Sequence, residues 1–272
     1  MGAGRLKLVA RTAEPDELKA YREANPTFGW DEMRQDAEGR AVYDVIRPRL
    51  IEGQGGICAF CEIEIINLDP THCRVEHFHP KSDRSTPHNW ALDWQNMIAV
   101  CMGGSQRHQV LPYTKEPLPE NLSCDAHKDK MIQSHRLEEC CEGWIINPVA
   151  LPAFPRLFFL EKSTGELLPD GQCCSEVSVE GNKHPTTQAL VEYTINMLNL
   201  NCDRLCEARK SVLWNIERNK KRLRDAAKTP RQGMDELAGR FLQQRWPGFF
   251  TTIRFCLGDA AERYLQNNKY RG

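Results

Sequence analysis

The sequence predicts an α+β protein in which a small metal-binding unit is embedded in a mostly helical chain. Four cysteines frame the central stretch: Cys58 and Cys61 lie in one tight turn, and Cys101 and Cys124 follow later. The apolar runs beside these cysteines are short, as in strands, whereas apolar residues toward both ends of the chain recur at helical spacing. A chain of 272 residues with 40% hydrophobic content can bury one core with a helical appendage, or form two closely packed units.

The segment before the first cysteine, residues 1–56, is predicted to be helical. A proline suited to the first helical turn, early acidic residues and a closing proline predict a short helix between Pro15 and Pro26. Residues 30–56 space their apolar side chains for one further helix, which Pro48 bends and a run of glycines ends. This helix leads the chain into the first cysteine pair.

Residues 57–135 are predicted to hold the metal-binding unit. Residues 57–66 predict a hairpin whose turn carries both thiolates, because two intervening residues let one tight turn present two sulfurs to one ion. The apolar run before Glu76 predicts a strand. Residues 103–121 are polar and rich in proline and glycine, which predicts a loop between the third and fourth cysteines of the set.

The last segment, residues 136–272, is predicted to contain short strands followed by helices. Between Trp144 and Pro169, apolar runs broken by prolines and by a Ser-Thr-Gly turn predict a hairpin. Apolar residues then recur at helical spacing toward the end of the chain. The predicted helices cover residues 185–201, 203–227, 236–246 and 251–268.

The charge of the whole chain does not mark a nucleic-acid binder, because 36 Lys and Arg residues almost cancel 37 Asp and Glu residues. A phosphate-binding surface must therefore be local. Residues 203–231 carry ten basic and four acidic residues. This segment could bind nucleic acid, and it could equally be a solvated helix face or a docking surface for an acidic partner. The chain begins without the apolar run of a signal peptide and has no stretch of about 18 apolar residues, so we expect a cytoplasmic protein that contacts no membrane.

The twelve cysteines predict reduced thiols and metal ligation rather than disulfides, because the chain begins without a secretion signal. The thiolates of Cys58, Cys61, Cys101 and Cys124 form a closed, all-sulfur set, which is the pattern of structural zinc. Gly104 stands where a second two-residue spacing would place a cysteine, so the alternative is a group of buried thiols without a metal.

The other eight cysteines divide into two groups. Those within apolar or helical patterns are predicted to be core residues: Cys73, Cys202, Cys206 and Cys256. The two doublets are ambiguous, with a second metal site as one alternative: Cys140 and Cys141, and Cys173 and Cys174.

A second kind of chemistry overlaps the cysteine stretch. Glu76 and Asp125 offer hard oxygen ligands, which suit magnesium or manganese, and His77 is then available as a general base for phosphodiester hydrolysis. Adjacent strand residues point to opposite faces, so Glu76 and His77 share a site only if the backbone bends after Glu76. A lone histidine or lysine is ordinarily a solvated surface residue. The candidate phosphate contacts are His79, Lys81 and Lys128.

Around these residues the sequence resembles the HNH endonucleases. The likeness is carried by "GGICAFCE" at 55–62, "VEHFHPKS" at 75–82, "LDWQNMIAVC" at 92–101 and "CDAHK" at 124–128. These motifs look like those of the PtuB-like branch, which is associated with Septu and retron systems. The likeness extends through "NPTFGWDEM", "INPVALPAFPRLFF" and "TINMLNLNCDRLCEARK", so it covers most of the chain.

The resemblance implies a ββα-metal finger and a role for each matching residue. Glu76 looks like the metal-binding acid and His77 like the general base. Asn96 is similar to the middle asparagine that orients the base or its loop. Asp125 looks like the second metal ligand, where the family more often has asparagine or histidine. The PtuB-like branch is also expected to have a long loop between the last two zinc cysteines, which accounts for Gly104.

The resemblance also implies a function. The expected enzyme is a metal-dependent HNH endonuclease that hydrolyses nucleic-acid phosphodiester bonds as the effector of a bacterial antiphage defence system, leaving 5′-phosphate and 3′-hydroxyl ends. Expected partners are DNA or RNA, a PtuA-like ATPase of the ABC/SMC type and, in some systems, a retron reverse transcriptase with its msDNA. The alternatives are a non-catalytic zinc module that bridges a partner protein and nucleic acid, and a stand-alone HNH restriction nuclease. Glu76, His77 and Asn96 favour the enzyme, because a binding module needs no acid, base and amide at these offsets.

Overall fold

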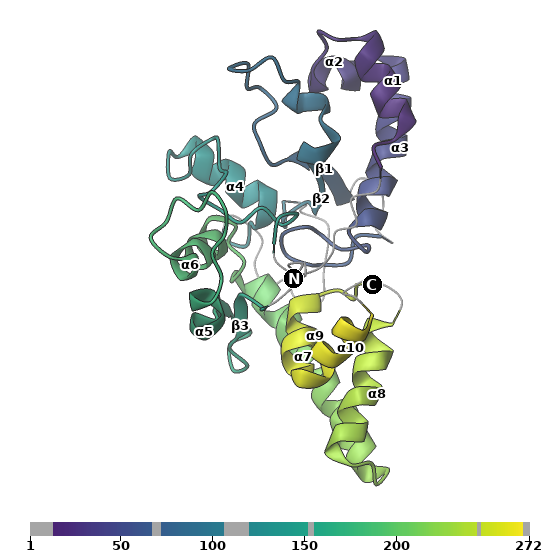
Figure 1. The fold of residues 1–272 in the computed structure, drawn as a ribbon, viewed down its shortest axis with the longest axis vertical. Helices are drawn as coiled ribbons and strands as arrows, with labels where there is room; N and C mark the ends of the chain where they lie inside the picture. Colours follow the sequence, from purple (N-terminus) through teal and green to yellow (C-terminus); the bar gives the residue numbers. More distant parts are fainter. Residues whose placement is uncertain (1–12, 67–71, 106–119, 152–154, 244–245, 269–272) are drawn as a thin grey trace.

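The computed structural model describes residues 13–66, 72–105, 120–151, 155–243 and 246–268. In Figure 1 the N-terminal helices (purple) lie at one end of the long axis and the C-terminal helices (yellow-green) at the other. The strands of the cysteine stretch lie between these two groups. The loop predicted at 103–121 falls largely outside the described residues.

The N-terminal segment forms three helices within the described residues: α1 (Asp16–Ala24), α2 (Trp30–Gln35) and α3 (Ala37–Gly53). The first confirms the predicted short helix. The single helix predicted over 30–56 is wrong, because the chain is extended at Asp36, whose carboxylate accepts a hydrogen bond from Gly39 N at 2.9 Å and caps α3. A Cβ at Gly39 would meet the carbonyl oxygen of Met33 at 2.2 Å, so the close approach of α2 and α3 requires glycine there.

The central segment contains an antiparallel strand pair, two short 3-10 turns and a helix: β1 (Cys73–His77), η2 (Trp90–Leu92), η3 (Trp94–Asn96), β2 (Met97–Cys101) and α4 (Cys124–Gln133). The strand predicted before Glu76 is confirmed as β1, and Glu76 pairs with Ile98 of β2. α4 contacts β2. The hairpin predicted at 57–66 is a tight turn with one antiparallel bridge, between Ile57 and Glu64.

The last segment contains a short hairpin followed by helices: β3 (Phe158–Leu160), β4 (Leu167–Pro169), α5 (Gly171–Ser175), α6 (Thr187–Met197), α7 (Asp203–Asp225), α8 (Pro230–Leu242), α9 (Phe250–Leu257) and α10 (Asp259–Asn267). The antiparallel pair β3 and β4 confirms the predicted hairpin, and α6 and α7 confirm the first two predicted helices. α8 begins earlier than predicted because Thr229 caps it and a proline occupies its first position. The single helix predicted at 251–268 is wrong, because Gly258, at φ 51°, separates α9 from α10.

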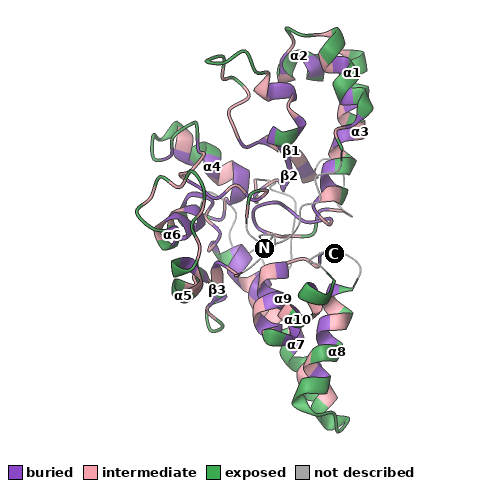
Figure 2. Ribbon diagram, in the orientation of Figure 1, coloured by how far each residue is buried: buried purple, intermediate pink, exposed green. Residues whose placement is uncertain are grey.

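One hydrophobic core joins the three segments (Figure 2). It extends from Leu18 in α1 through Val100 in β2 to Leu265 in α10. The predicted division into domains at residues 1–56, 57–135 and 136–272 stays a prediction, because side chains from all three segments pack in this one core. The cysteines predicted to be core residues are all buried, as expected: Cys73, Cys202, Cys206 and Cys256. Within the described residues, no helix is both long enough and apolar enough to cross a bilayer.

Candidate metal centre and active site

The four predicted zinc cysteines come together at the meeting point of the 58–61 turn, the end of β2 and the start of α4. The Sγ atoms lie 3.6 Å apart for Cys61 and Cys101, 3.8 Å for Cys101 and Cys124, and 4.0 Å for Cys58 and Cys124. All four sulfurs lie within 4.8 Å of one another and are buried. A tetrahedral ion with metal–sulfur bonds of about 2.3 Å requires sulfur separations of about 3.8 Å, so the donor set fits zinc.

The thiols of this cluster affect one another's protonation. Burial raises the pKa of Cys61 and of Cys124 well above the ordinary thiol value. Burial opposes ionisation of Cys58 as well, but hydrogen bonds from the neighbouring cysteines lower its pKa well below that value. A cluster of this kind is stabilised when a divalent cation replaces the thiol protons.

Arg204 of α7 supplies positive charge beside the cysteine cluster. Its side chain is 3% exposed, and its guanidinium donates to Ser123 Oγ at 2.6 Å, next to Cys124 in the chain. Burial opposes its charged form, but the neighbouring cysteines raise the pKa of Arg204 above its ordinary value. This role could not be predicted from the sequence, because Arg204 is one of ten basic residues in a long charged segment.

The carboxyl groups of Glu76 and Asp125 adjoin each other, although one comes from β1 and the other from α4. Burial and the neighbouring Glu76 carboxylate raise the pKa of Asp125 to about 7, and the nearby Arg74 opposes this rise only in part. Asp125 Oδ1 is buried and has no hydrogen-bond partner among the described residues. A buried pair of carboxyl groups with an unused oxygen is a donor set for a hard divalent cation.

Two cations accompany this carboxyl pair. Arg74, on the same face of β1 as Glu76, forms an ion pair with Asp125, and the ammonium of Lys128 donates to Glu76. Lys128 is only 4% exposed; burial opposes its charge, but Glu76 raises its pKa above the ordinary lysine value. Lys128, predicted to contact phosphate, thus lies inside the protein beside the acid. Arg74 was missed from the sequence, although its position two residues before Glu76 places it on the same strand face.

His77 lies on the opposite face of β1 from Glu76. The strand continues through His77 with alternating burial, so the bend that would turn both side chains to one side is absent. His77 Nε2 lies 2.9 Å from the carbonyl oxygen of Ala91, which can only accept, so Nε2 carries the proton and Nδ1 the lone pair. The ring packs edge-on against Trp30 at 4.5 Å, and burial lowers the pKa of His77 to about 4. The imidazole is therefore neutral, the form that accepts a proton.

Asn96 is buried behind the segment that follows His77. Its Oδ1 accepts a hydrogen bond from His79 N at 2.6 Å, and its Nδ2 donates to the carbonyl oxygens of His79 and Trp90, each at 2.9 Å. The backbone of Asn96 also accepts from Phe78 N at 3.0 Å. The side-chain amide thus fixes the backbone immediately after His77.

His79 and Lys81 have partners other than Glu76 and Asp125. The imidazole of His79 lies between Asp83 and Glu142, with one ring nitrogen on each carboxylate, and stacks on Trp90 at 3.9 Å. Lys81 Nζ donates to Asp31 Oδ1 at 3.0 Å on the surface. A phosphate contact at either residue stays a prediction.

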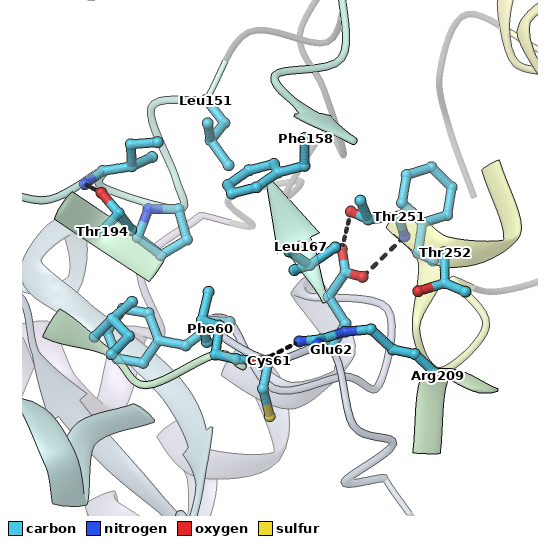
Figure 3. A pocket seen from close by; sticks show the side chains of 16 residues that line it. Phe60, Cys61, Glu62, Leu151, Phe158, Leu167, Thr194, Arg209, Thr251 and Thr252 are labelled. Carbon is cyan, nitrogen blue, oxygen red and sulfur yellow. Dashed lines mark hydrogen bonds between the residues drawn. The ribbon is translucent and has the colours of Figure 1, made fainter. Parts of the chain in front are cut away.

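A pocket of ≈ 60 Å³ lies beside the cysteine turn, and Cys61 contributes to its lining (Figure 3). Apolar side chains line most of it, and the buried Arg209 donates to the carbonyl oxygens of Leu200 and Gly165 at its edge. Beside Cys61, the Glu62 carboxylate accepts from Thr251 N at 2.8 Å and so caps α9. The pocket has room for little more than water. Neither Glu76 nor Asp125 lines this pocket.

The strands, the helix, the four-cysteine cluster and the carboxyl pair fit a protein of mixed helix and strand structure with donor sets suited to metal ions. No family model matches the sequence. The chain is 34% identical over 257 residues to an Escherichia coli protein named "Retron Ec83 putative HNH endonuclease", and the match covers 92% of each chain. The chain therefore belongs to the retron-associated HNH endonucleases. The predicted resemblance to HNH endonucleases is confirmed, and the mixed fold is compatible with it.

Proposed function

We propose that the protein is a metal-dependent endonuclease of the PtuB-like branch that hydrolyses nucleic-acid phosphodiester bonds as the effector of an antiphage defence system. The observation that carries this proposal is the adjoining pair of carboxyl groups, Glu76 and Asp125, directly beside a zinc-type cysteine cluster. A binding module has no use for two carboxyl groups held together in a buried position, because that arrangement is unfavourable without a cation.

We assign β1, β2 and α4 to a ββα-metal finger. Zinc on Cys58, Cys61, Cys101 and Cys124 would join the 58–61 turn to β2 and α4, and its role would be structural because the four thiolates leave no open position. Asp125 follows Cys124 directly at the start of α4, so the same ion would fix the position of one of the two carboxyl groups.

Glu76 and Asp125 would hold Mg²⁺ or Mn²⁺, which would supply positive charge for the phosphate and the leaving oxygen. The residues of the chain support this in two ways. Asp125 offers an oxygen that accepts no hydrogen bond among the described residues. Arg74 and Lys128 balance the two carboxylates, and their cationic side chains would also favour an approaching phosphate.

His77 would act as the general base. Its Nδ1 would take a proton from water, and the Ala91 carbonyl oxygen, already bound to Nε2, would stabilise the resulting imidazolium. Asn96 would hold the backbone after His77 in place. Because Glu76 and His77 alternate across β1, the scissile phosphate would have to lie at the end of the strand, where both side chains can reach it.

The partners in this proposal are DNA or RNA, a PtuA-like ATPase of the ABC/SMC type, and a retron reverse transcriptase with its msDNA. The retron context of the Escherichia coli relative supports the last of these. A net charge of −1 favours weak binding of nucleic acid by the chain alone, so a partner that presents the substrate would be needed.

The test is cleavage of plasmid and of RNA by wild type, His77→Ala and His135→Asn, with and without the co-expressed ATPase. His135 is an exposed histidine after α4 and serves as the matched control. We expect His77→Ala to lose at least about 100-fold in rate with unchanged zinc content and circular dichroism, and Mg²⁺ removal to stop the wild type. Cleavage retained by His77→Ala rejects the assigned base. Metal-independent binding without cleavage by any variant would instead favour the non-catalytic zinc module, and site-specific cutting without the ATPase would favour a stand-alone restriction nuclease.

A further inference from the structure

A second cluster of metal-ligating side chains lies between the loop after β1 and the segment after α4. His79, Asp83 and Cys140 each offer one donor atom, and these atoms all lie within 4.8 Å of one another. Glu142 Oε1 lies 2.5 Å from His79 Nδ1, so it would accept a hydrogen bond from Nδ1 while His79 Nε2, on the side of Asp83, faces the ion. None of these residues belongs to the four-cysteine cluster.

The carboxylates of Asp83 and Glu142 hold the imidazole of His79 from two sides, one on each ring nitrogen. Asp83 Oδ2 lies 2.8 Å from His79 Nε2, and Asp83 Oδ1 accepts from Ser85 N at 2.7 Å, which fixes its orientation. The Ser85 N–H and His79 lower the pKa of Asp83 to about 2, so this carboxylate is ionised at neutral pH. Glu142 Oε2 is buried and has no hydrogen-bond partner among the described residues. The negative charge around the imidazole is therefore only partly compensated.

Cys140 is an exposed residue, and among its neighbours only Lys183 favours the ionised form of its thiol. Burial of the sulfur raises the pKa of Cys140, and the carboxylates of Glu142 and Asp83 raise it further. A divalent cation between these groups would reverse both carboxylate effects and favour the thiolate.

The cluster is held in position before any ion binds. The His79 backbone is fixed by Asn96, and the His79 ring stacks on Trp90. From the other side, Cys141 Sγ donates to the Phe78 carbonyl oxygen at 3.2 Å. The residues on both sides of the cluster are thus attached to each other, so binding would require little ordering of the backbone.

We propose that His79, Asp83 and Cys140 form a second metal site that takes a transition-metal ion of the Zn²⁺ class, with Glu142 orienting the imidazole through His79 Nδ1. An imidazole, a thiolate and a carboxylate suit zinc, whereas magnesium would prefer oxygen ligands alone. The ion would connect the loop that follows His77 to the segment that follows α4. This role for His79 differs from the phosphate contact predicted from the sequence, and it does not depend on the proposed nuclease activity.

The test is the zinc content of the full chain after equilibrium dialysis against buffered free Zn²⁺, measured by mass spectrometry of the metal. We expect about two equivalents for wild type and for the control Cys173→Ser, and about one for Cys140→Ser and Asp83→Asn. Cys173 is a suitable control because it also belongs to a cysteine doublet and is half-buried. About one equivalent in wild type, or a second equivalent that Cys140→Ser and Asp83→Asn retain, overturns the proposal.

Alkylation gives a readout that needs no variant. Zn²⁺ should slow the reaction of Cys140 with iodoacetamide and leave that of Cys173 unchanged, as mapped on peptides after digestion. Equal protection of both thiols, or of neither, argues against a metal at Cys140. Circular dichroism of the variants checks that the fold is retained, which we expect because Cys140 is on the surface.

Discussion

The ammonium of Lys128 donates to the Glu76 carboxylate in the interior of the protein, so that an ion pair joins α4 to β1. Asp125 lies on the same helix, adjoins the same carboxylate and pairs with Arg74. Two acidic and two basic side chains thus form one network, buried at Asp125 and Lys128 and partly exposed at Arg74, in which the charge of each group depends on the others.

Removing Lys128 should destabilise the protein more than removing an exposed lysine. Lys128→Met leaves the Glu76 carboxylate buried against Asp125 without its cation, which should cost about 3–5 kcal/mol in the free energy of unfolding. Urea denaturation measures this, with Lys130→Met on the exposed side of α4 as the control. Glu76→Gln in the Lys128→Met background should restore part of the loss. Equal stability of the two lysine variants would show that the pair contributes nothing.

Loss of one cluster cysteine should remove the zinc and the stability that depends on it. Cys101→Ser should lower the zinc content by about one equivalent and abolish cooperative melting of the central segment, because metal binding to such a cluster is coupled to folding. Metal analysis and thermal unfolding measure the two effects. Cys256→Ser, at a buried cysteine outside the cluster, should keep its zinc. Full zinc content in Cys101→Ser would contradict the site.

The stability of the protein without added Mg²⁺ should depend on pH through two opposing groups. The pKa of Asp125 is raised from 3.8 to about 7, so the folded state binds this proton more tightly than the unfolded state does. The contribution of Asp125 to the free energy of unfolding therefore falls as pH rises from 3.8 to about 7. The pKa of His77 is lowered from 6.5 to about 4, so its contribution grows as pH rises between these values. The two effects offset each other in wild type.

Asp125→Asn separates them. With the carboxyl group gone, the contribution of His77 is no longer offset by Asp125, and the variant should gain stability relative to wild type as pH rises from about 4 to about 6.5. Urea denaturation across this range measures the slope, and Asp44→Asn, at an exposed position of α3, should follow the wild type. Parallel curves for Asp125→Asn and wild type would refute the raised pKa.

The basic face of α7 should contribute to nucleic-acid binding. Lys221 and Arg222 are exposed there, and Trp214, 63% exposed, carries Arg218 over its ring at 4.7 Å. Replacing Lys221 and Arg222 by Glu should weaken binding and reduce the salt slope by about one for each lost phosphate contact. Fluorescence anisotropy at several salt concentrations measures this. Replacing Arg40 and Arg49, which are exposed on α3, by Glu is the matched control. Unchanged binding in the α7 variant would favour a solvated face or an acidic partner.

The helices and the cysteine cluster could be predicted because their signals are local or depend on residue type. Caps and apolar spacing define α1, α6 and α7, and thiolates near a tight turn indicate a metal wherever the chain later brings them. The break at Asp36 could not be predicted in the same way. It depends on Gly39 contacting Met33, which the spacing of apolar residues does not encode.

The candidate active site was predictable in its residue types and less so in its arrangement. Alternation along a strand correctly indicates that Glu76 and His77 face opposite sides. The pairing of Lys128 with Glu76 depends on how α4 packs beside β1, which is a tertiary property. The catalytic roles of these residues stay predictions, as do the partners and the PtuB-like branch.

Glu62 holds the cysteine turn against the other end of the chain. Its carboxylate binds Thr251, 189 positions later, and its carbonyl oxygen accepts from Phe249 N at 2.8 Å. On the ribosome, the turn therefore obtains these contacts only after nearly the whole polypeptide has been synthesised. An incomplete translation product that carries Glu76 and His77 but stops before α9 lacks these contacts to the cysteine turn.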